Sequence, residues 1–179
     1  MAKKALVLGS FDLTHAGHFH LFESASKLAD EVHVGIAHDS LVRAFKGDDR
    51  PIYSVGERRY MIRMCKYVTH VYIYGDPSST KDMNDHEQQL IVLKVKPDIF
   101  VQGVDKQDAP DLPGWLEDQG IQRVSTPRLS PEITTSHFIR KIRKAKPKGF
   151  EAFAKARGDV SQYYYPQGST AERAKYEGR

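Results

Sequence analysis

The feature that most constrains this chain is a short apolar run that passes, through a turn of small residues, into a helix bearing two histidines. Residues 5–8 (Ala-Leu-Val-Leu) are aliphatic and short, which is typical of a buried strand. Gly9 and Ser10 end this run, and Thr14 can cap the N-terminus of a helix expected over residues 17–28. A strand that enters a helix through such a turn directs backbone N–H groups and the positive helix end at one place. This arrangement favours the binding of a phosphate group.

A pair of histidines makes the stretch more specific than a general anion site. His15 and His18 are three residues apart, so both can lie on one face of the first helical turn and present two imidazoles to one ligand. Imidazoles beside a polyphosphate can donate hydrogen bonds to oxygens that gain negative charge in a transition state. Gly17 lacks a Cβ, which would let a nucleotide base or ribose approach the helix backbone. A metal site with His20 is a weaker interpretation because His20 falls on another face, and a capped helix with ordinary histidines is the remaining alternative.

The rest of the chain alternates between strand and helix patterns. Ser54 begins a capping-box pattern, and an apolar-rich helix is expected before Pro97. This alternation predicts an α/β fold, a Rossmann-like doubly wound sheet of five parallel strands, in which ligands bind beyond the carboxyl ends of the strands. After the first strand, the strands are expected at residues 31–37, 70–74, 98–101 and 121–125, with the apolar-rich helix at 84–95.

Polar residues after the second strand add candidates for the site. Residues 43–51 show neither helical nor strand periodicity, so we expect a polar loop that covers the site as a lid. Lys46 in this loop is our candidate point charge for phosphate oxygens. Asp39 can face the cleft or cap a helix.

Residues 9–12 (Gly-Ser-Phe-Asp) followed by residues 15–18 (His-Ala-Gly-His) resemble the HxGH nucleotidyltransferase superfamily, in its cytidylyltransferase-like branch. The resemblance covers roughly residues 3–145. It implies an enzyme that joins a nucleoside triphosphate to a phosphorylated small molecule and releases pyrophosphate. It also implies nucleotide contacts from the turn and the helix start, with Asp12 assisting a metal or the acceptor; the nucleotide-binding positions are Gly9, Ser10, Phe11 and Gly17.

Further positions match the family more locally. Arg58 follows an acidic residue at a helix start, where the resemblance implies contact with substrate or triphosphate. Gly103 and Asp105 fit a G-x-D stretch that lines the nucleotide site in the family. Lys106 stands where cytidylyltransferases often carry tryptophan, and this departure leaves the base preference open.

Hydroxyl residues near the end of the matched region form a second candidate phosphate seat. Thr134, Thr135 and Ser136 precede a helix, whose N-terminus offers backbone and side-chain donors together. The run is similar to a second family motif, in which Arg128 takes the upstream arginine position, one residue further from the isoleucine than in the glycerol-phosphate pattern. A plain helix cap is the alternative explanation of the hydroxyls.

These observations predict a nucleotidyltransferase that uses CTP and a small phosphorylated alcohol such as glycerol 3-phosphate. The residues expected to act on the phosphates are His15, His18, Lys46 and Arg128. Mg²⁺ is expected as the counter-ion of the triphosphate, with few protein ligands. The alternatives are an adenylyltransferase that uses ATP on a sugar phosphate or flavin mononucleotide (FMN), and a nucleotide-binding regulatory protein without catalysis.

Composition sets the remaining limits. The chain of 179 residues predicts one domain over residues 1–146 and a C-terminal tail over residues 147–179. Its apolar runs are shorter than the roughly 20 residues that span a bilayer, and residues 1–4 leave no room for a signal peptide, so we expect a cytoplasmic protein without a membrane partner. A net charge of +4 suits anionic substrates, and nucleic acid is a minority interpretation that depends on the basic residues 140–148. The family resemblance implies a homodimer.

Overall fold

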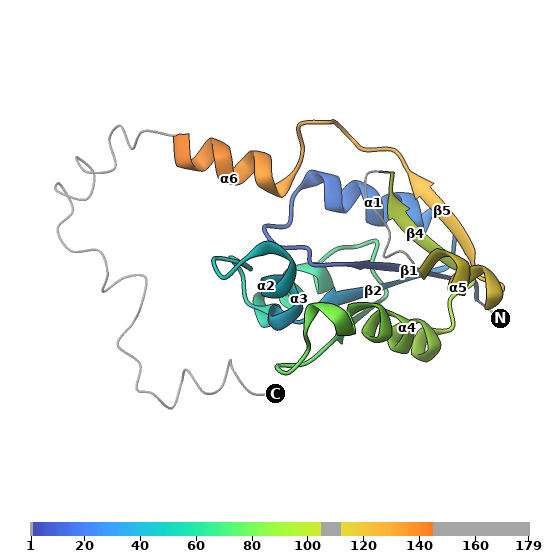
Figure 1. Cartoon of the computed structure of the whole chain (residues 1–179). Coiled ribbons are helices and arrows are strands. Elements are labelled where there is room, and N and C mark those ends of the chain that lie inside the picture. Colours follow the sequence, from blue (N-terminus) through green and yellow to red (C-terminus); the bar gives the residue numbers. More distant parts are fainter. Residues whose placement is uncertain (1, 105–111, 145–179) are drawn as a thin grey trace, which may run out of the picture. The chain divides into compact units, whose positions relative to one another are not determined.

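A computed structural model of the chain describes residues 2–104 and 112–144 (Figure 1). Its five strands form one sheet with the order β3-β2-β1-β4-β5, in which every neighbouring pair is parallel. The predicted Rossmann-like α/β fold is therefore confirmed. The strands are β1 (Lys4–Gly9), β2 (Glu31–Ala37), β3 (His70–Tyr74), β4 (Ile99–Gly103) and β5 (Gln122–Thr126). The helices are α1 (Ala16–Ser26), α2 (Asp39–Lys46), α3 (Val55–Arg63), the 3₁₀ turn η1 (Lys81–Met83), α4 (Asn84–Val95), α5 (Leu112–Asp118) and α6 (Thr135–Lys144).

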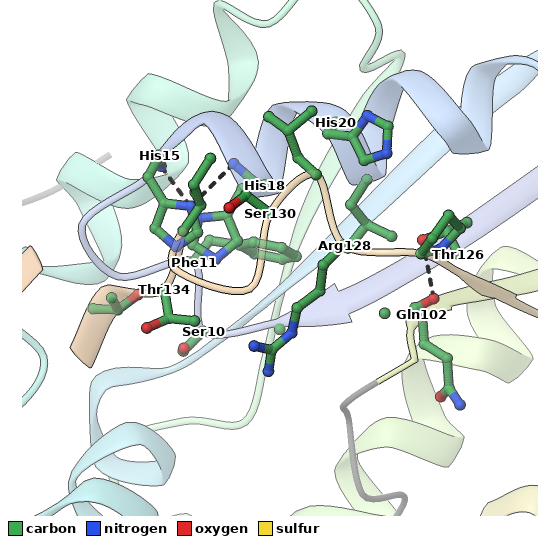
Figure 2. A pocket seen from close by; sticks show the side chains of 18 of the residues that line it. Ser10, Phe11, His15, His18, His20, Gln102, Thr126, Arg128, Ser130 and Thr134 are labelled. Atoms are coloured by element: carbon green, nitrogen blue, oxygen red, sulfur yellow. Dashed lines mark hydrogen bonds between the residues drawn. The ribbon is translucent and has the colours of Figure 1, made fainter. Parts of the chain in front are cut away.

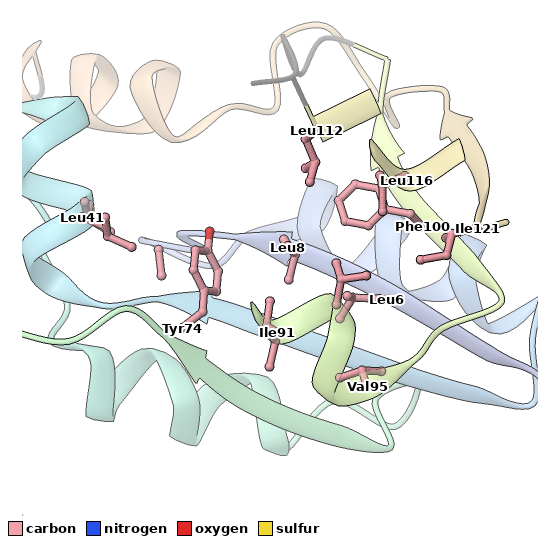
Figure 3. Close-up of a cluster of buried hydrophobic side chains, with 13 residues drawn as sticks. Leu6, Leu8, Leu41, Tyr74, Ile91, Val95, Phe100, Leu112, Leu116 and Ile121 are labelled. Atoms are coloured by element: carbon pink, nitrogen blue, oxygen red, sulfur yellow. The ribbon is translucent and has the colours of Figure 1, made fainter. Parts of the chain in front are cut away.

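Helices cover both faces of the sheet, which explains why the central strand β1 is apolar and buried from Ala5 to Gly9. Side chains alternate between the faces of a strand, so Leu6 and Leu8 point to one side. They pack there with Leu41 of α2, Ile91 of α4 and Leu116 of α5 (Figure 3). The opposite face holds a second cluster with α1 and α3, made of aliphatic and aromatic side chains that include Ala5, Val7, Phe22, Ala25 and Ile62.

The strand order places a ligand crevice beside β1. The chain passes from β1 to β2 on one side, whereas β4 pairs with β1 on the other. Helix α1, which follows β1, packs on one face of the sheet, while α5, which follows β4, packs on the opposite face. The connections that leave β1 and β4 therefore diverge, and such a switch point is where open parallel sheets bind ligands.

The N-cap of the first helix lies one residue later than predicted. His15, with an extended backbone at φ −141° and ψ 173°, is the N-cap, and the helix starts at Ala16. The Thr14 hydroxyl donates to the Phe11 carbonyl at 3.0 Å, so it closes the preceding turn. The prediction of Thr14 as the cap was wrong because imidazole nitrogens of His15 and His18 take the role of the capping oxygen.

The segment predicted as a lid loop is partly helical. Helix α2 continues through Lys46, so only residues 47–51 of the predicted loop lie outside it. Leu41 and Val42 are buried and anchor the helix against the sheet, while its remaining residues are polar or exposed. With only two adjacent buried residues, the helix shows no apolar periodicity in its sequence. By contrast, the capping box at Ser54 is present as predicted, with Glu57 as its partner.

Contacts along the chain separate Met1–His137 from Phe138–Arg179. The first unit contains the sheet and the site described below, and of the second the structure describes only the part of α6 up to Lys144. Asp105 and the boundary expected between residues 146 and 147 lie outside the described residues, so both stay predictions. Within the described ranges, none of the helices has the length and apolar character needed to cross a bilayer.

Candidate active site

A cavity of about 290 Å³ opens at the carboxyl ends of β1, β4 and β5 (Figure 2). It lies at the switch point of the sheet, where the strand order predicts a ligand site. The structure brings together here most of the site residues predicted from the sequence, although they are separated by more than 100 positions. Those lining the cavity are Gly9, Ser10, Phe11, His15, Gly17, His18, Lys46, Gly103, Arg128, Thr134 and Thr135.

The two histidines are stacked against each other at the start of α1. Their ring centroids are 3.8 Å apart with an interplanar angle of 20°. The backbone N–H of Gly17 donates to His15 Nδ1 at 3.2 Å, and that of His15 donates to His18 Nδ1 at 3.3 Å. The first turn of the helix thus fixes the orientation of both rings.

This hydrogen bonding also decides which ring nitrogen carries the proton. A nitrogen that accepts from an N–H group is unprotonated, so in the neutral form of each ring the proton is on Nε2. Burial lowers the pKa of His15, which favours the neutral form at neutral pH. Two neutral imidazoles can stack closely, whereas two imidazolium ions would repel each other. The site therefore offers Nε2–H groups as hydrogen-bond donors.

The turn beneath the histidines is held by a buried aromatic ring. Phe11 is 3 % exposed, adopts a positive φ of 49°, and meets the His18 ring edge-on at 5.3 Å. A Cβ on Gly9 would come within 2.9 Å of the Phe11 ring, so glycine at the end of β1 lets this ring fold over the strand. A Cβ on Gly17 would meet the His15 ring at 3.1 Å and Ile133 at 3.3 Å. Gly17 therefore makes room for protein atoms as well as for any ligand.

Lys46 reaches the cavity from the end of α2. Its ammonium donates to the Ser10 hydroxyl at 2.7 Å. Although the residue is exposed overall, burial around the ammonium, followed by the neighbouring Arg50 cation, lowers the pKa of Lys46. A phosphate anion bound there would counteract both effects by stabilising the charged form. The position therefore suits the predicted role of a point charge.

Asp12 is buried beneath the site and does not line the cavity. Its residue is 1 % exposed, and its carboxylate accepts from Arg50 Nε at 2.7 Å and from the backbone N–H groups of Ile52 and Tyr53. Burial alone would raise the pKa of Asp12, but the hydrogen bonds from Tyr53 and Ile52 and the Arg50 cation lower it overall. These donors occupy the carboxylate oxygens and give Asp12 a structural role, while its predicted part in assisting a metal or the acceptor stays a prediction.

Arg58 and Asp39 form a second ion pair beneath the site. Arg58 is fully buried and donates to Asp39 Oδ1 at 2.5 Å, to the Ser10 carbonyl at 2.5 Å and to the Tyr53 carbonyl at 3.1 Å. Neither charged residue lines the cavities described here. In the structure they fasten the end of β1 to α2 and α3, and their predicted contact with substrate stays a prediction.

The hydroxyl residues at the start of α6 divide their roles. Thr134 Oγ1 accepts the backbone N–H of His137 at 3.1 Å, so it is a helix cap that keeps its own proton to donate. The Thr135 hydroxyl donates its proton to the Asp12 carbonyl at 3.1 Å and ties the helix start to the turn after β1. Ser136 is exposed and does not line the cavity. Of the three predicted phosphate donors, Thr134 is best placed.

The far wall comes from the ends of β4 and β5. Arg128 extends along the cavity in Figure 2 and donates to the Pro131 carbonyl at 3.3 Å. Gln102 and Thr126 also line the wall, and the Thr126 hydroxyl donates to the Gln102 carbonyl at 3.2 Å. Neither residue was predicted from the sequence as part of the site. Their position at the carboxyl ends of neighbouring parallel strands was the signal that could have identified them.

The chemistry of this lining does not fit a resident magnesium ion. Mg²⁺ prefers carboxylate and other hard oxygen ligands. The described residues around the first cavity include imidazoles, hydroxyls, a lysine and an arginine, but no carboxylate. This set suits an anion, so any Mg²⁺ would be held by the oxygens of the triphosphate itself.

A second, larger cavity of about 760 Å³ adjoins the first and shares Gly9, Ser10, Lys46 and Gln102 with it. Its remaining wall is mostly apolar and includes three aromatic rings, with polar groups from η1 and α4 at one side. The aromatic members are Phe45, Tyr74 and Phe100. The volume lies within the range of about 300–1,000 Å³ typical of pockets for drug-sized ligands.

Comparison with known proteins agrees with this geometry. Residues 6–147 match the family model described as cytidylyltransferase-like. The chain is 38% identical over 144 residues to an FAD synthase of Thermococcus kodakarensis, covering 78% of this chain and 91% of that protein. It is 33% identical over 138 residues to the bifunctional protein HldE of Campylobacter jejuni, covering 77% of this chain but only 27% of that protein. A lipopolysaccharide core biosynthesis protein from Thermoplasma volcanium has a similar structure, with a TM-score of 0.56, 26% identity, and coverage of 72% of this chain and 97% of that one.

The buried carboxylate at Asp12 yields a test of stability. We expect Asp12→Asn to lower the free energy of unfolding near neutral pH by about 3–5 kcal/mol, because it leaves the Arg50 guanidinium buried without its counter-charge. The folded-state pKa of Asp12 is lowered, so the stabilisation is present above the ordinary aspartate pKa of 3.8 and disappears as the pH falls below it. Urea unfolding of both proteins between about pH 7 and about pH 3 gives the difference in their free energies of unfolding. This difference should be constant near neutral pH and should shrink as the pH falls toward about 3.

Asp48→Asn provides the control, because Asp48 is an exposed residue of the loop that carries Arg50. It should change the stability by less than about 0.5 kcal/mol at every pH. An equal effect of the two substitutions would show that the Asp12 network does not stabilise the fold.

Proposed function

The chain belongs to the cytidylyltransferase-like family of nucleotidyltransferases, and we propose that it transfers AMP from ATP to FMN with release of pyrophosphate. The observation that carries this proposal is the pair of adjoining cavities. One is lined by the histidine pair and by cationic and hydroxyl groups, and the other by aliphatic and aromatic side chains that include the half-exposed ring of Phe45. Ser10 and Lys46, which both cavities share, would lie where the two substrates meet.

The reaction is an in-line displacement at the α-phosphorus of the triphosphate. An oxygen of the acceptor phosphate forms a bond to that phosphorus while the bond to the β-phosphate oxygen breaks, and the electron pair leaves with pyrophosphate. No covalent intermediate with the protein is needed. The contribution of the protein is to position the two phosphates and to stabilise the charge that moves between them.

The residues of the first cavity would supply that stabilisation. The Nε2–H groups of His15 and His18 donate to phosphate oxygens of the triphosphate, and their stacked, capped rings need no rearrangement to do so. Lys46 contributes a positive charge at the junction of the cavities. Arg128 and the Thr134 hydroxyl, with the backbone N–H groups at the start of α6, would hold the departing pyrophosphate. Mg²⁺ would enter as the complex with ATP, in keeping with the carboxylate-free lining.

The second cavity supports an acceptor with a large planar ring system. Phe45 is 49 % exposed at its wall, and the Lys81 ammonium lies 5.7 Å from the centre of its ring. An exposed aromatic face of this kind can stack on an isoalloxazine ring. The junction with the first cavity would receive the phosphate end of the same molecule.

The choice of ATP and FMN over CTP and glycerol 3-phosphate is supported by two observations. The FAD synthase relative is matched over nearly its whole length, and FAD is FMN joined to AMP. The volume of the second cavity also exceeds what a three-carbon acceptor requires. Lys106, in place of the tryptophan typical of cytidylyltransferases, agrees with this choice. The use of CTP with glycerol 3-phosphate, expected from the sequence, stays a prediction, and the substrate assay described next tests it as well.

The first prediction from this proposal concerns substrates. The purified chain with Mg²⁺ is incubated with ATP or CTP in combination with FMN, a heptose phosphate or glycerol 3-phosphate, and pyrophosphate and products are measured. We expect ATP with FMN to yield FAD and pyrophosphate in equal amounts. Faster turnover of CTP with glycerol 3-phosphate would overturn the substrate assignment but keep the reaction type. Nucleotide binding without pyrophosphate release for any pair would instead indicate the regulatory alternative.

The second prediction concerns the histidine pair. His18→Ala should lower kcat by about 10²–10³-fold, the scale for loss of one preorganised donor to a transition state. His86→Ala, which removes an exposed histidine of α4, is the matched control and should retain normal turnover. Circular dichroism should show that both variants are folded. Normal kcat in folded His18→Ala protein would exclude His18 from the mechanism.

The third prediction separates the acceptor from the nucleotide. Phe45→Ala should raise the KM for FMN by about 3- to 10-fold, corresponding to the loss of one aromatic stacking contact, while the KM for ATP stays unchanged. Tyr60→Ala, which removes an exposed aromatic ring outside both cavities, should change neither KM. An equal rise for both substrates in Phe45→Ala would contradict the assignment of the second cavity to the acceptor.

A further inference from the structure

A cluster of metal-ligating side chains lies at the opposite end of the sheet from the candidate active site. Glu31, His33 and His70 each offer one ligand atom, and these atoms all lie within 4.8 Å of one another. Glu31 and His33 belong to the first half of β2, and His70 is the first residue of β3. We propose that this cluster binds a Zn²⁺ ion that fastens the edge strand β3 to β2.

The parallel register brings the three side chains to one face. Residues two apart in a strand point to the same side, so Glu31 and His33 share a face of β2. His33 is paired with His70 in the register of β2 and β3. Their rings lie 4.8 Å apart between centroids. The arrangement therefore follows from strand pairing and does not depend on a loop conformation.

The ligand set and its spacing suit zinc. Zn²⁺ binds imidazole nitrogen and carboxylate oxygen at about 2.0–2.2 Å in tetrahedral geometry, which sets neighbouring ligand atoms about 3.3 Å apart. Glu31 Oε2 and His33 Nε2 are already 2.9 Å apart. His70 is exposed, so its ring is able to rotate inward by the remaining distance. Water would complete the fourth position.

Tyr72 allows His33 to change its tautomer without losing a partner. With Nε2 donating to the Glu31 carboxylate, Nδ1 accepts from the Tyr72 hydroxyl, and the two atoms are 3.2 Å apart. Zinc on Nε2 would require the proton to move to Nδ1, which would then donate to the same hydroxyl oxygen. A hydroxyl serves as donor or acceptor, so Tyr72 can pair with either tautomer of His33. The second shell of the proposed site is therefore already in place.

The charged groups around the cluster both favour and oppose a cation. The Glu31 carboxylate, hydrogen-bonded to His33, supplies the negative charge. Two cations act against binding: Lys4 on the neighbouring strand and Lys94 of α4, whose ammonium is 5.5 Å from the centre of the Tyr72 ring. Both lysines have long, flexible side chains that can turn to solvent.

The proposed zinc site is separate from the catalytic chemistry. It lies at the amino ends of β2 and β3, whereas both cavities open at the carboxyl ends of the sheet. In the sheet of the described residues, β3 is an edge strand whose one neighbour is β2. A metal bridging the two would stabilise the fold without touching either substrate.

The test measures binding and stability in protein without a histidine tag. Isothermal titration with ZnCl₂ should show one site per chain, and Zn²⁺ at 100 times its Kd should raise Tm by about 5–10 °C. His70→Ala, which removes an exposed ligand, should abolish both effects and keep the Tm of the metal-free protein. MgCl₂ should have no such effect, because Mg²⁺ prefers oxygen ligands.

His86→Ala, an exposed histidine outside the cluster, is the matched control and should bind zinc like the unaltered protein. Glu31→Gln should weaken binding by at least about 10-fold while retaining a hydrogen bond to His33. The proposal is overturned if the unaltered protein takes up no zinc, or if His70→Ala binds it equally well. It is also overturned if His86→Ala loses binding, since the site would then lie elsewhere.

Discussion

The arrangement of the candidate active site depends on one buried carboxylate. Asp12 lies in the turn after β1, and its side chain accepts hydrogen bonds from Arg50 and from the backbone of residues 52 and 53, while its carbonyl accepts the Thr135 hydroxyl. Two distant segments, residues 50–53 and the start of α6 at Thr135, thus converge on a single residue. A buried carboxylate without its donors would be strongly destabilising, so the loop before α3 must close around it. The start of α6 is tied to the same residue through the Asp12 backbone carbonyl. The histidine pair and Thr134 are placed as a consequence.

The distribution of charge around this centre explains why the first cavity suits an anion. The carboxylates of Asp12 and Asp39 are directed into the protein, where Arg50 and Arg58 neutralise them. The cavity itself is lined by Lys46, Arg128 and the imidazoles of His15 and His18. Negative side chains support the framework, while positive and donor groups face the ligand. A triphosphate would therefore meet favourable electrostatics without displacing an internal ion pair.

The sequence predicted the fold well where the signals are local, and the site only in part. β2, β3 and α4 begin and end as expected, and the capping box at Ser54 is present, because apolar periodicity and capping residues act within a few positions. The helix cap at His15 was missed because imidazole seldom takes this role. The roles of Asp12, Asp39 and Arg58 could not be predicted, since charged residues near a cleft suggest ligand contacts. Only the three-dimensional structure shows that Arg50 pairs with Asp12 and Arg58 with Asp39.

β3 connects the two ends of the sheet. His70, at its start, belongs to the Glu31, His33 and His70 cluster, and Tyr74, at its end, forms part of the aromatic wall of the second cavity. Four residue steps of an extended strand span about 13 Å, which is too far for direct contact between a metal and a substrate there. Within the described part of the chain β3 pairs with β2 alone, so its position depends on that ladder and on packing against α4 on one face and α3 on the other. An ion at His70 would hold the free end of this strand, so its effect on the acceptor cavity would be to keep the Tyr74 wall in register rather than to take part in the reaction.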